Sequence, residues 1–196
     1  MFIPYVERSI DFHITFHITR DVDEITSPLL IKKTDVIMNV IVGVADMKIS
    51  NDPDAKLITY SLGSCIGIGV YDEISKAGGI AHFMLPESKL DVAKAKKNPY
   101  MFADTCIPRL FKSMYQLGAK KQRMRVIVVG GAQILDQKGF FNIGKRNCMA
   151  VKKIFWKNNV MINYKDVEGT VNRTLKIAIK SGQFWLKTSG VGEIEI

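Results

Sequence analysis

Cys65 and His82 are the two side chains in this sequence whose types and spacing suit nucleophilic catalysis. Cys65 lies in the segment Gly63-Ser64-Cys65-Ile66-Gly67, which has the glycine-x-nucleophile-x-glycine form of a sharp turn that exposes its central side chain. A nearby imidazolium lowers the pKa of a thiol, and the same histidine can protonate a departing amine. The backbone N–H groups of Ser64 and Cys65 could act as an oxyanion hole. The pattern therefore indicates acyl transfer by a cysteine.

The two residues are expected to adjoin the arms of one β-hairpin. Residues 66–71 alternate small and branched residues, and residues 79–85 form a second apolar run that ends before Pro86. A turn centred on residues 72–75 places Cys65 directly opposite His82, about 5 Å away. A turn displaced toward Gly78 would offset them. An α/β-hydrolase is excluded, because neither a helix nor a late histidine follows the cysteine turn.

The remaining segments predict a single α+β domain that is rich in strands, with helices on one side. We expect strands at 39–45, 56–60 and 125–129, a terminal hairpin over 175–187, a helix from Asp104 as N-cap to Gly118, and a second helix from Asn142 to 158–159. Residues 12–19 alternate apolar and polar side chains and predict a further strand. We therefore divide the chain into a strand-like N-terminal extension (1–37) and a main domain (38–196).

Composition limits the classes of function. The formal net charge of +9 favours an acidic partner, but the lysines are scattered and lack the interleaved aromatic residues of single-strand binders, which argues against nucleic-acid binding. The apolar runs are too short for a membrane helix, and the first residues do not resemble a secretory signal, so we expect a cytoplasmic protein without membrane insertion. The three cysteines are widely spaced and predict free thiols.

Structural interpretations compete with the catalytic one. A cysteine beside an apolar strand is often a small core residue, which remains an alternative for Cys65 and is our prediction for Cys106 and Cys148. His13 and His17 share one strand face, but no further ligand joins them, so we expect no metal site. The pair Gly130-Gly131 follows a strand without a P-loop lysine, so we interpret it as a close-packed turn.

Several linked motifs together resemble the CheD family of chemoreceptor glutamine deamidases over residues 38–196. They are Leu62-Gly63-Ser64-Cys65, Ala81-His82-Phe83-Met84-Leu85-Pro86, Phe102-Ala103-Asp104-Thr105, Gly130-Gly131-Ala132 and Asn142-Ile143-Gly144-Lys145-Arg146-Asn147. Two features depart from the family pattern. Glu168 stands where members usually have glycine, and residues 1–37 have no counterpart, so they are either a lineage-specific strand or an over-long gene start with Met38 as the true beginning.

The resemblance implies a three-layer α/β/β sandwich and a cysteine amidohydrolase that converts receptor glutamines to glutamates and releases ammonia, tuning chemotaxis adaptation. It implies Cys65, His82 and Thr59 as catalytic residues, with Gly63 and Ser64 in the oxyanion and substrate loop. No metal or other cofactor is expected. Some members also hydrolyse receptor glutamyl methyl esters. The implied partners are methyl-accepting chemotaxis receptors and a CheC-type CheY-phosphate phosphatase, and a non-catalytic binding partner of that phosphatase is the alternative function.

Overall fold

The computed structural model describes residues 37–134 and 141–196. The strands of these ranges are β1 (Met38–Ile41), β2 (Asp46–Ser50), β3 (Ala55–Leu62), β4 (Ile66–Asp72), β5 (Ala77–Phe83), β6 (Met124–Gly130), β7 (Tyr164–Val167), β8 (Arg173–Ala178), β9 (Gln183–Thr188) and β10 (Gly192–Glu195). The helices are α1 (Val92–Lys97), α2 (Ala103–Gln116) and α3 (Ile143–Lys157), with short 3-10 turns at Ser88–Leu90 and Lys121–Arg123. The predicted strand at 12–19 and the histidines His13 and His17 lie outside the described residues.

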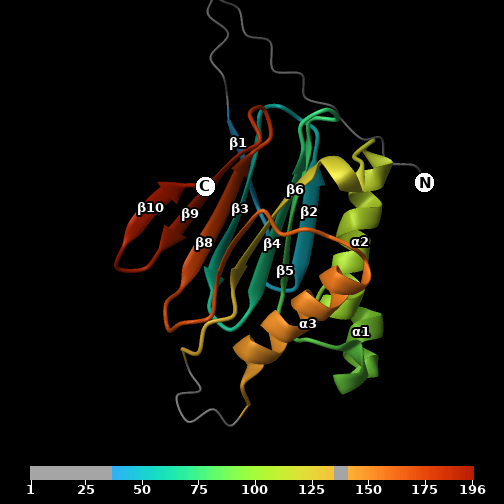
Figure 1. The fold of residues 1–196 in the computed structure, drawn as a ribbon, viewed down its shortest axis with the longest axis vertical. Helices are drawn as coiled ribbons and strands as arrows, with labels where there is room; N and C mark the ends of the chain where they lie inside the picture. Colours follow the sequence, from blue (N-terminus) through green and yellow to red (C-terminus); the bar gives the residue numbers. More distant parts are fainter. Residues whose placement is uncertain (1–36, 135–140) are drawn as a thin grey trace, which may run out of the picture. The chain divides into compact units, whose positions relative to one another are not determined.

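The strands form two five-stranded mixed sheets, ordered β1-β3-β8-β9-β10 and β2-β5-β4-β6-β7. One apolar cluster joins the second sheet to α2 and α3, and another fills the space between the two sheets. Figure 1 shows the three helices on the side of the second sheet that faces away from the first sheet. The fold is therefore mixed α+β, as the sequence predicts.

Strand β4 is buried on both faces, and its residue alternation explains why. Ile66, Ile68 and Val70 belong to the cluster under the helices, whereas the glycines between them face the first sheet. A Cβ atom at Gly69 would lie 2.5 Å from Cε1 of Phe184 on β9. The alternating glycines thus let the two sheets approach closely, as expected from the sequence.

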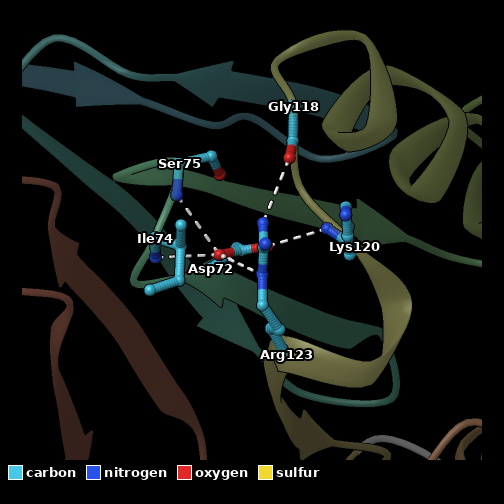
Figure 2. Close-up of polar contacts among 6 residues, drawn as sticks. All are labelled: Asp72, Ile74, Ser75, Gly118, Lys120 and Arg123. Carbon is cyan, nitrogen blue, oxygen red and sulfur yellow. Dashed lines mark hydrogen bonds and ion pairs between the residues drawn. The ribbon is translucent and has the colours of Figure 1, made fainter.

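The β4–β5 hairpin is present, and a buried carboxylate fixes its turn. Asp72 is fully buried at the end of β4 and accepts hydrogen bonds from the backbone N–H groups of Ile74, Ser75 and Lys120, at 2.9, 3.3 and 2.7 Å. Figure 2 shows the Arg123 guanidinium bound to the same carboxylate, with an Nη2 to Oδ2 distance of 2.7 Å. The resulting register pairs Asp72 with Ala77. The turn is therefore residues 73–76, one residue later than the arrangement that would set Cys65 opposite His82.

Several element boundaries differ from the prediction. The strand predicted at 39–45 ends at Ile41, and the chain then turns back into β2. The first predicted helix begins at Ala103 with Phe102 as its N-cap, because the carboxylate of Asp104 instead accepts hydrogen bonds from the N–H and hydroxyl of Ser88. The elements α1, β2, β7 and β10 were not predicted. The second helix, strand β6 and the terminal β8–β9 hairpin were predicted correctly apart from their ends.

Candidate active site

A chain of hydrogen bonds links Thr59 on β3 to His82 on β5. The Thr59 hydroxyl donates to the backbone carbonyl of Val42 at 2.9 Å and lies 2.8 Å from Nδ1 of His82. A hydroxyl has one hydrogen, and a carbonyl can only accept. Thr59 must therefore accept its second bond from Nδ1–H of His82. This assignment leaves the lone pair of the neutral imidazole on Nε2.

Burial keeps the His82 imidazole neutral. The residue is completely inaccessible to solvent, and desolvation lowers its pKa to about 4, although the Asp46 carboxylate on neighbouring β2 acts in the opposite direction. Nε2 is buried and has no hydrogen-bond partner among the described residues. His82 therefore has an unoccupied proton acceptor, held in one tautomer by Thr59.

Cys65 lies one residue before β4 and diagonally across the hairpin from His82. Gly67 pairs with His82, so continuing the register by two residues sets Cys65 opposite Met84. Of the two arrangements that the sequence left open, the displaced turn is the one present, so Cys65 and His82 are not directly opposite each other. Strand alternation nevertheless puts Cys65 and Gly67 on one face, the face shared by His82. Diagonal neighbours of this kind are separated by about 7–8 Å, with their side chains closer.

The thiol of Cys65 is expected to be protonated at neutral pH. The residue is half-buried, and desolvation raises the pKa of its thiol, while its own backbone N–H has a smaller lowering effect. With His82 also neutral, the expected thiolate–imidazolium pair does not describe the resting site. The geometry instead suits transfer of the thiol proton to Nε2 as the sulfur attacks.

The loop that carries Cys65 has all three of its carbonyl groups bound to other parts of the protein. Ala132 N–H donates to the Gly63 carbonyl at 2.8 Å, the Asn147 side chain donates to Ser64 at 2.9 Å, and Gly131 N–H donates to Cys65 at 2.8 Å. Within the described ranges, no hydrogen bond uses the N–H groups of Ser64 and Cys65. These two groups are therefore available as donors to an oxyanion.

Two glycines at the end of β6 allow the close backbone contact behind this loop. Gly130 and Gly131 have φ angles of +110° and +68°, which residues with side chains rarely adopt. A Cβ atom at Gly130 would lie only 2.3 Å from the Cys65 carbonyl oxygen. The prediction of a close-packed turn at this position is confirmed, and the turn supports the segment that holds Cys65.

A cavity of about 580 Å³ opens in front of the Cys65 loop. Its walls include Ser61, Gly63, Ser64 and Cys65 on one side and Gln133, Phe141 and Asn172 on the other. Cys65 therefore faces a space large enough for a side chain of another protein. His82 does not line this cavity, and its Nε2 is buried.

Cys106 and Cys148 were both predicted to be core residues, but only Cys106 is fully buried. Cys106 on α2 is fully buried, and desolvation raises its pKa to about 12. Cys148 on α3 is only half-buried, and burial together with the nearby Glu168 carboxylate raises its pKa to about 11. All three cysteines are free thiols. No cluster of three metal-binding side chains occurs in residues 37–134 and 141–196.

Glu168 adopts the backbone conformation that a glycine would favour. Its φ angle is +68°, its N–H donates to the Gly130 carbonyl at 2.8 Å, and its own carbonyl accepts from Arg173 at 2.9 Å. The loop therefore keeps a left-handed residue at this position although a side chain is present. Its contacts hold the Gly130 turn from the side opposite Cys65.

Sequence reasoning assigned no role to Asn147, although it lies in one of the recognised motifs. Its side chain is completely buried and contacts the segments of both Cys65 and His82. An amide at a buried position of an amphipathic helix was the available signal, because such a group must be hydrogen-bonded.

Comparison with known proteins gives one consistent result. Residues 84–188 match the family described as CheD chemotactic sensory transduction. The chain is 53% identical over 152 residues to the probable chemoreceptor glutamine deamidase CheD 1 of Syntrophus aciditrophicus, covering 78% of this chain and 95% of the relative. It is 44% identical over 151 residues to the probable chemoreceptor glutamine deamidase CheD of Solibacter usitatus, covering 77% and 89% respectively. The counterpart in Syntrophotalea carbinolica is 38% identical over 160 residues, with 81% and 99% covered.

Proposed function

Because the chain belongs to the CheD family, we propose that it is a chemoreceptor glutamine deamidase that acts in chemotaxis and uses Cys65 as its nucleophile. The observation that carries the residue assignment is the Thr59–His82 hydrogen bond, which leaves a buried Nε2 lone pair on the face shared with Cys65. The family match begins at residue 84, so these three residues are proposed from geometry and from the motifs around them.

The first half of the proposed reaction forms a thioester. A receptor glutamine side chain enters the cavity, and the Cys65 sulfur attacks its carboxamide carbon while the thiol proton passes to Nε2 of His82. The oxygen that becomes negative accepts hydrogen bonds from the N–H groups of Ser64 and Cys65. His82 then returns the proton to the amide nitrogen, and ammonia leaves.

The second half hydrolyses the thioester. Water loses a proton to Nε2 of His82 and attacks the acyl carbon, and the collapsing intermediate releases the Cys65 sulfur, which recovers the proton. The products are a glutamate side chain and the original enzyme. Thr59 accepts the Nδ1 hydrogen throughout and keeps Nε2 directed to the reacting atoms. Side chains and water supply every step, so no metal or other cofactor is part of the proposal.

Charge and redox state agree with this assignment. The net charge of +9 favours association with a substrate that becomes more acidic each time a glutamine is converted. The three cysteines are free thiols, which agrees with a reducing compartment, so we place the protein in the cytoplasm. In the described part of the chain, no helix has the length and apolar character needed to cross a membrane.

Three finer points belong to the same proposal. The order of helices, second sheet and first sheet supports the three-layer α/β/β sandwich that the CheD resemblance implies. Residues 38–196 are proposed as the deamidase domain, and β1 begins at Met38. A methyl ester has the same acyl carbon as an amide and a better leaving group, so we also propose hydrolysis of receptor glutamyl methyl esters at this site.

A CheC-type phosphatase remains a proposed partner through the family resemblance. A purely regulatory role without catalysis would not require a histidine tautomer fixed by Thr59 beside the Cys65 loop. Co-purification of the two proteins tests the partnership. Loss of ammonia release without loss of phosphatase binding in Cys65→Ala would separate the two roles.

The proposed activity is tested by ammonia release from the cytoplasmic fragment of a chemoreceptor. Wild-type protein should release ammonia, Cys65→Ala should release none, and Cys106→Ala should retain activity because that thiol lies in the helix-facing core. Circular dichroism of each variant verifies the fold. Equal ammonia release by Cys65→Ala and wild type would refute Cys65 as the nucleophile.

A further inference from the structure

Asn147 on α3 ties together the two chain segments that carry the proposed nucleophile and base. Its Nδ2 donates to the backbone carbonyl of Ser64 at 2.9 Å and to that of Met84 at 2.8 Å. Ser64 directly precedes Cys65, and Met84 lies two residues after His82. One fully buried amide group thus spans both arms at the open end of the hairpin.

We infer that Asn147 is a positioning residue for the proposed deamidation: by holding the Ser64 carbonyl, it directs the N–H of Cys65 toward the developing oxyanion. The inference rests on the proposed function. In a planar trans peptide, the carbonyl and the N–H of the next residue point in opposite directions. A Ser64 carbonyl fixed on α3 therefore fixes the Cys65 N–H on the side away from α3.

The surroundings of the Cys65 N–H agree with that direction. Among the described residues, no backbone carbonyl accepts a hydrogen bond from this N–H, and its interaction with its own thiol opposes the effect of burial on the thiol pKa. The donor is therefore next to the sulfur that attacks. An oxyanion formed at the attacked carbon would lie beside the same group.

The chemistry of the side chain supports a requirement for its two donors. A neutral amide NH₂ group donates two hydrogen bonds in a fixed planar arrangement, whereas an ionised carboxylate donates none and a hydroxyl donates one. Oδ1 of Asn147 is buried without a hydrogen-bond partner in the part of the chain that the structure describes. An unpaired buried acceptor destabilises the fold, so an apolar side chain would serve better at this position if packing were its only role.

The backbone of Met84, on the other arm of the hairpin, is also held by Asn147. Met84 follows the end of β5, where regular pairing with β4 has stopped. The bond from Asn147 to its carbonyl continues the connection past the last strand pair. This second bond anchors the same amide group, so Asn147 holds the Ser64 carbonyl in a fixed direction.

The test compares Asn147→Ala and the isosteric Asn147→Asp with Asn163→Ala. Asn163 is a matched control, since its side chain accepts a hydrogen bond from the Val126 N–H at 2.7 Å on the far part of β6. We measure kcat and KM for receptor deamidation, the rate of Cys65 alkylation by iodoacetamide, and Tm. Alkylation reports thiol access and ionisation but forms no oxyanion.

Both Asn147 variants should lose kcat by about ten- to hundredfold, because an oxyanion donor is misdirected rather than deleted. KM and the alkylation rate should change by less than about threefold, and Asn163→Ala should change Tm without changing kcat. Wild-type kcat in Asn147→Asp, which preserves shape and cannot form the cavity of the alanine variant, would overturn the inference. A parallel loss of alkylation and kcat would also overturn it. Inactive wild-type protein would instead refute the proposed function.

Discussion

Replacement of Thr59 by valine tests the part of the site that governs the protonation of His82. Valine has nearly the same shape as threonine but no hydroxyl, so Thr59→Val removes both bonds of the bridge. The buried Nδ1–H of His82 loses its acceptor, and the carbonyl of Val42 loses its donor. Both groups remain in a dry environment between the sheets, because Thr59 and His82 are fully buried.

The expected loss of stability follows from these two unpaired groups. Each unsatisfied buried donor or acceptor costs about 1–3 kcal/mol, so Thr59→Val should lower the free energy of unfolding by about 2–6 kcal/mol. For a domain of this size, that corresponds to a fall in Tm of about 4–24 °C. Thr59→Ser retains the hydroxyl and loses one methyl group, so it should cost about 1 kcal/mol.

The catalytic effect has a separate origin. Without an acceptor at Nδ1, the tautomer protonated on Nε2 competes with the active one, and a bias of about 1–3 kcal/mol corresponds to a roughly ten- to hundredfold loss of kcat. Ammonia release, measured well below the Tm of each variant, gives kcat, and thermal denaturation gives Tm. Thr59→Ser should stay within about threefold of wild type. Wild-type kcat in Thr59→Val would refute the tautomer argument, even if Tm falls.

Three further predictions follow from the electrostatics and the backbone. Because the His82 pKa is lowered to about 4, deamidation by stable protein should decline only as pH falls toward 4; a pH profile of kcat/KM with a midpoint at 6.5 would contradict a neutral buried base. Burial raises the Asp72 pKa, but the bonds from Arg123 and three backbone N–H groups outweigh it and hold the pKa below 3.8. The ionised carboxylate therefore stabilises the fold above its unfolded pKa and loses this effect as pH falls through the folded value. Asp72→Asn should lower the free energy of unfolding by about 2 kcal/mol at pH 7. Chemical denaturation should show a smaller difference between the variant and wild type near pH 3. An equal difference at both pH values would contradict a contribution from the ion pair. Glu168→Gly should raise stability by about 0.5–1 kcal/mol, because glycine adopts φ near +68° without strain; a lower Tm would show that the side chain matters more than the backbone.

Local patterns predicted the elements that present Cys65 and His82. The glycine alternation of β4, the apolar run of β5 and the helical spacing of α2 and α3 all depend on which residues face a core, and this signal is present in the sequence itself. The edge strands lack it. All four residues of β10 are exposed, and β7 has a largely polar sequence, so neither shows an apolar face that would mark a strand.

The relative position of Cys65 and His82 required contacts that are distant in the sequence. Moving the turn by one residue changes the cross-strand partner of Cys65 by two, and the turn is fixed by Asp72 accepting a bond from Lys120, 48 residues later. Sequence reasoning named Thr59 through family resemblance, while the direction of its hydrogen bonds depends on the Val42 carbonyl.

The protonation states were also beyond sequence reasoning. A cysteine and a histidine near each other suggested a charged pair, but both side chains are removed from solvent in the folded protein, and desolvation favours their neutral forms. The supporting role of Asn147 was also beyond sequence reasoning, because α3 reaches the Ser64 and Met84 carbonyls only in the folded chain.

The central claim is that receptor glutamines are deamidated through a thioester on Cys65. The most direct test is peptide-resolved mass spectrometry of a chemoreceptor cytoplasmic fragment after incubation with wild-type protein or Cys65→Ala, with and without hydroxylamine. The wild-type protein should convert specific glutamines to glutamates, and hydroxylamine should intercept the acyl group as a hydroxamate at the same positions. Cys65→Ala should give neither product. Formation of glutamate by Cys65→Ala at the wild-type rate would contradict the claim.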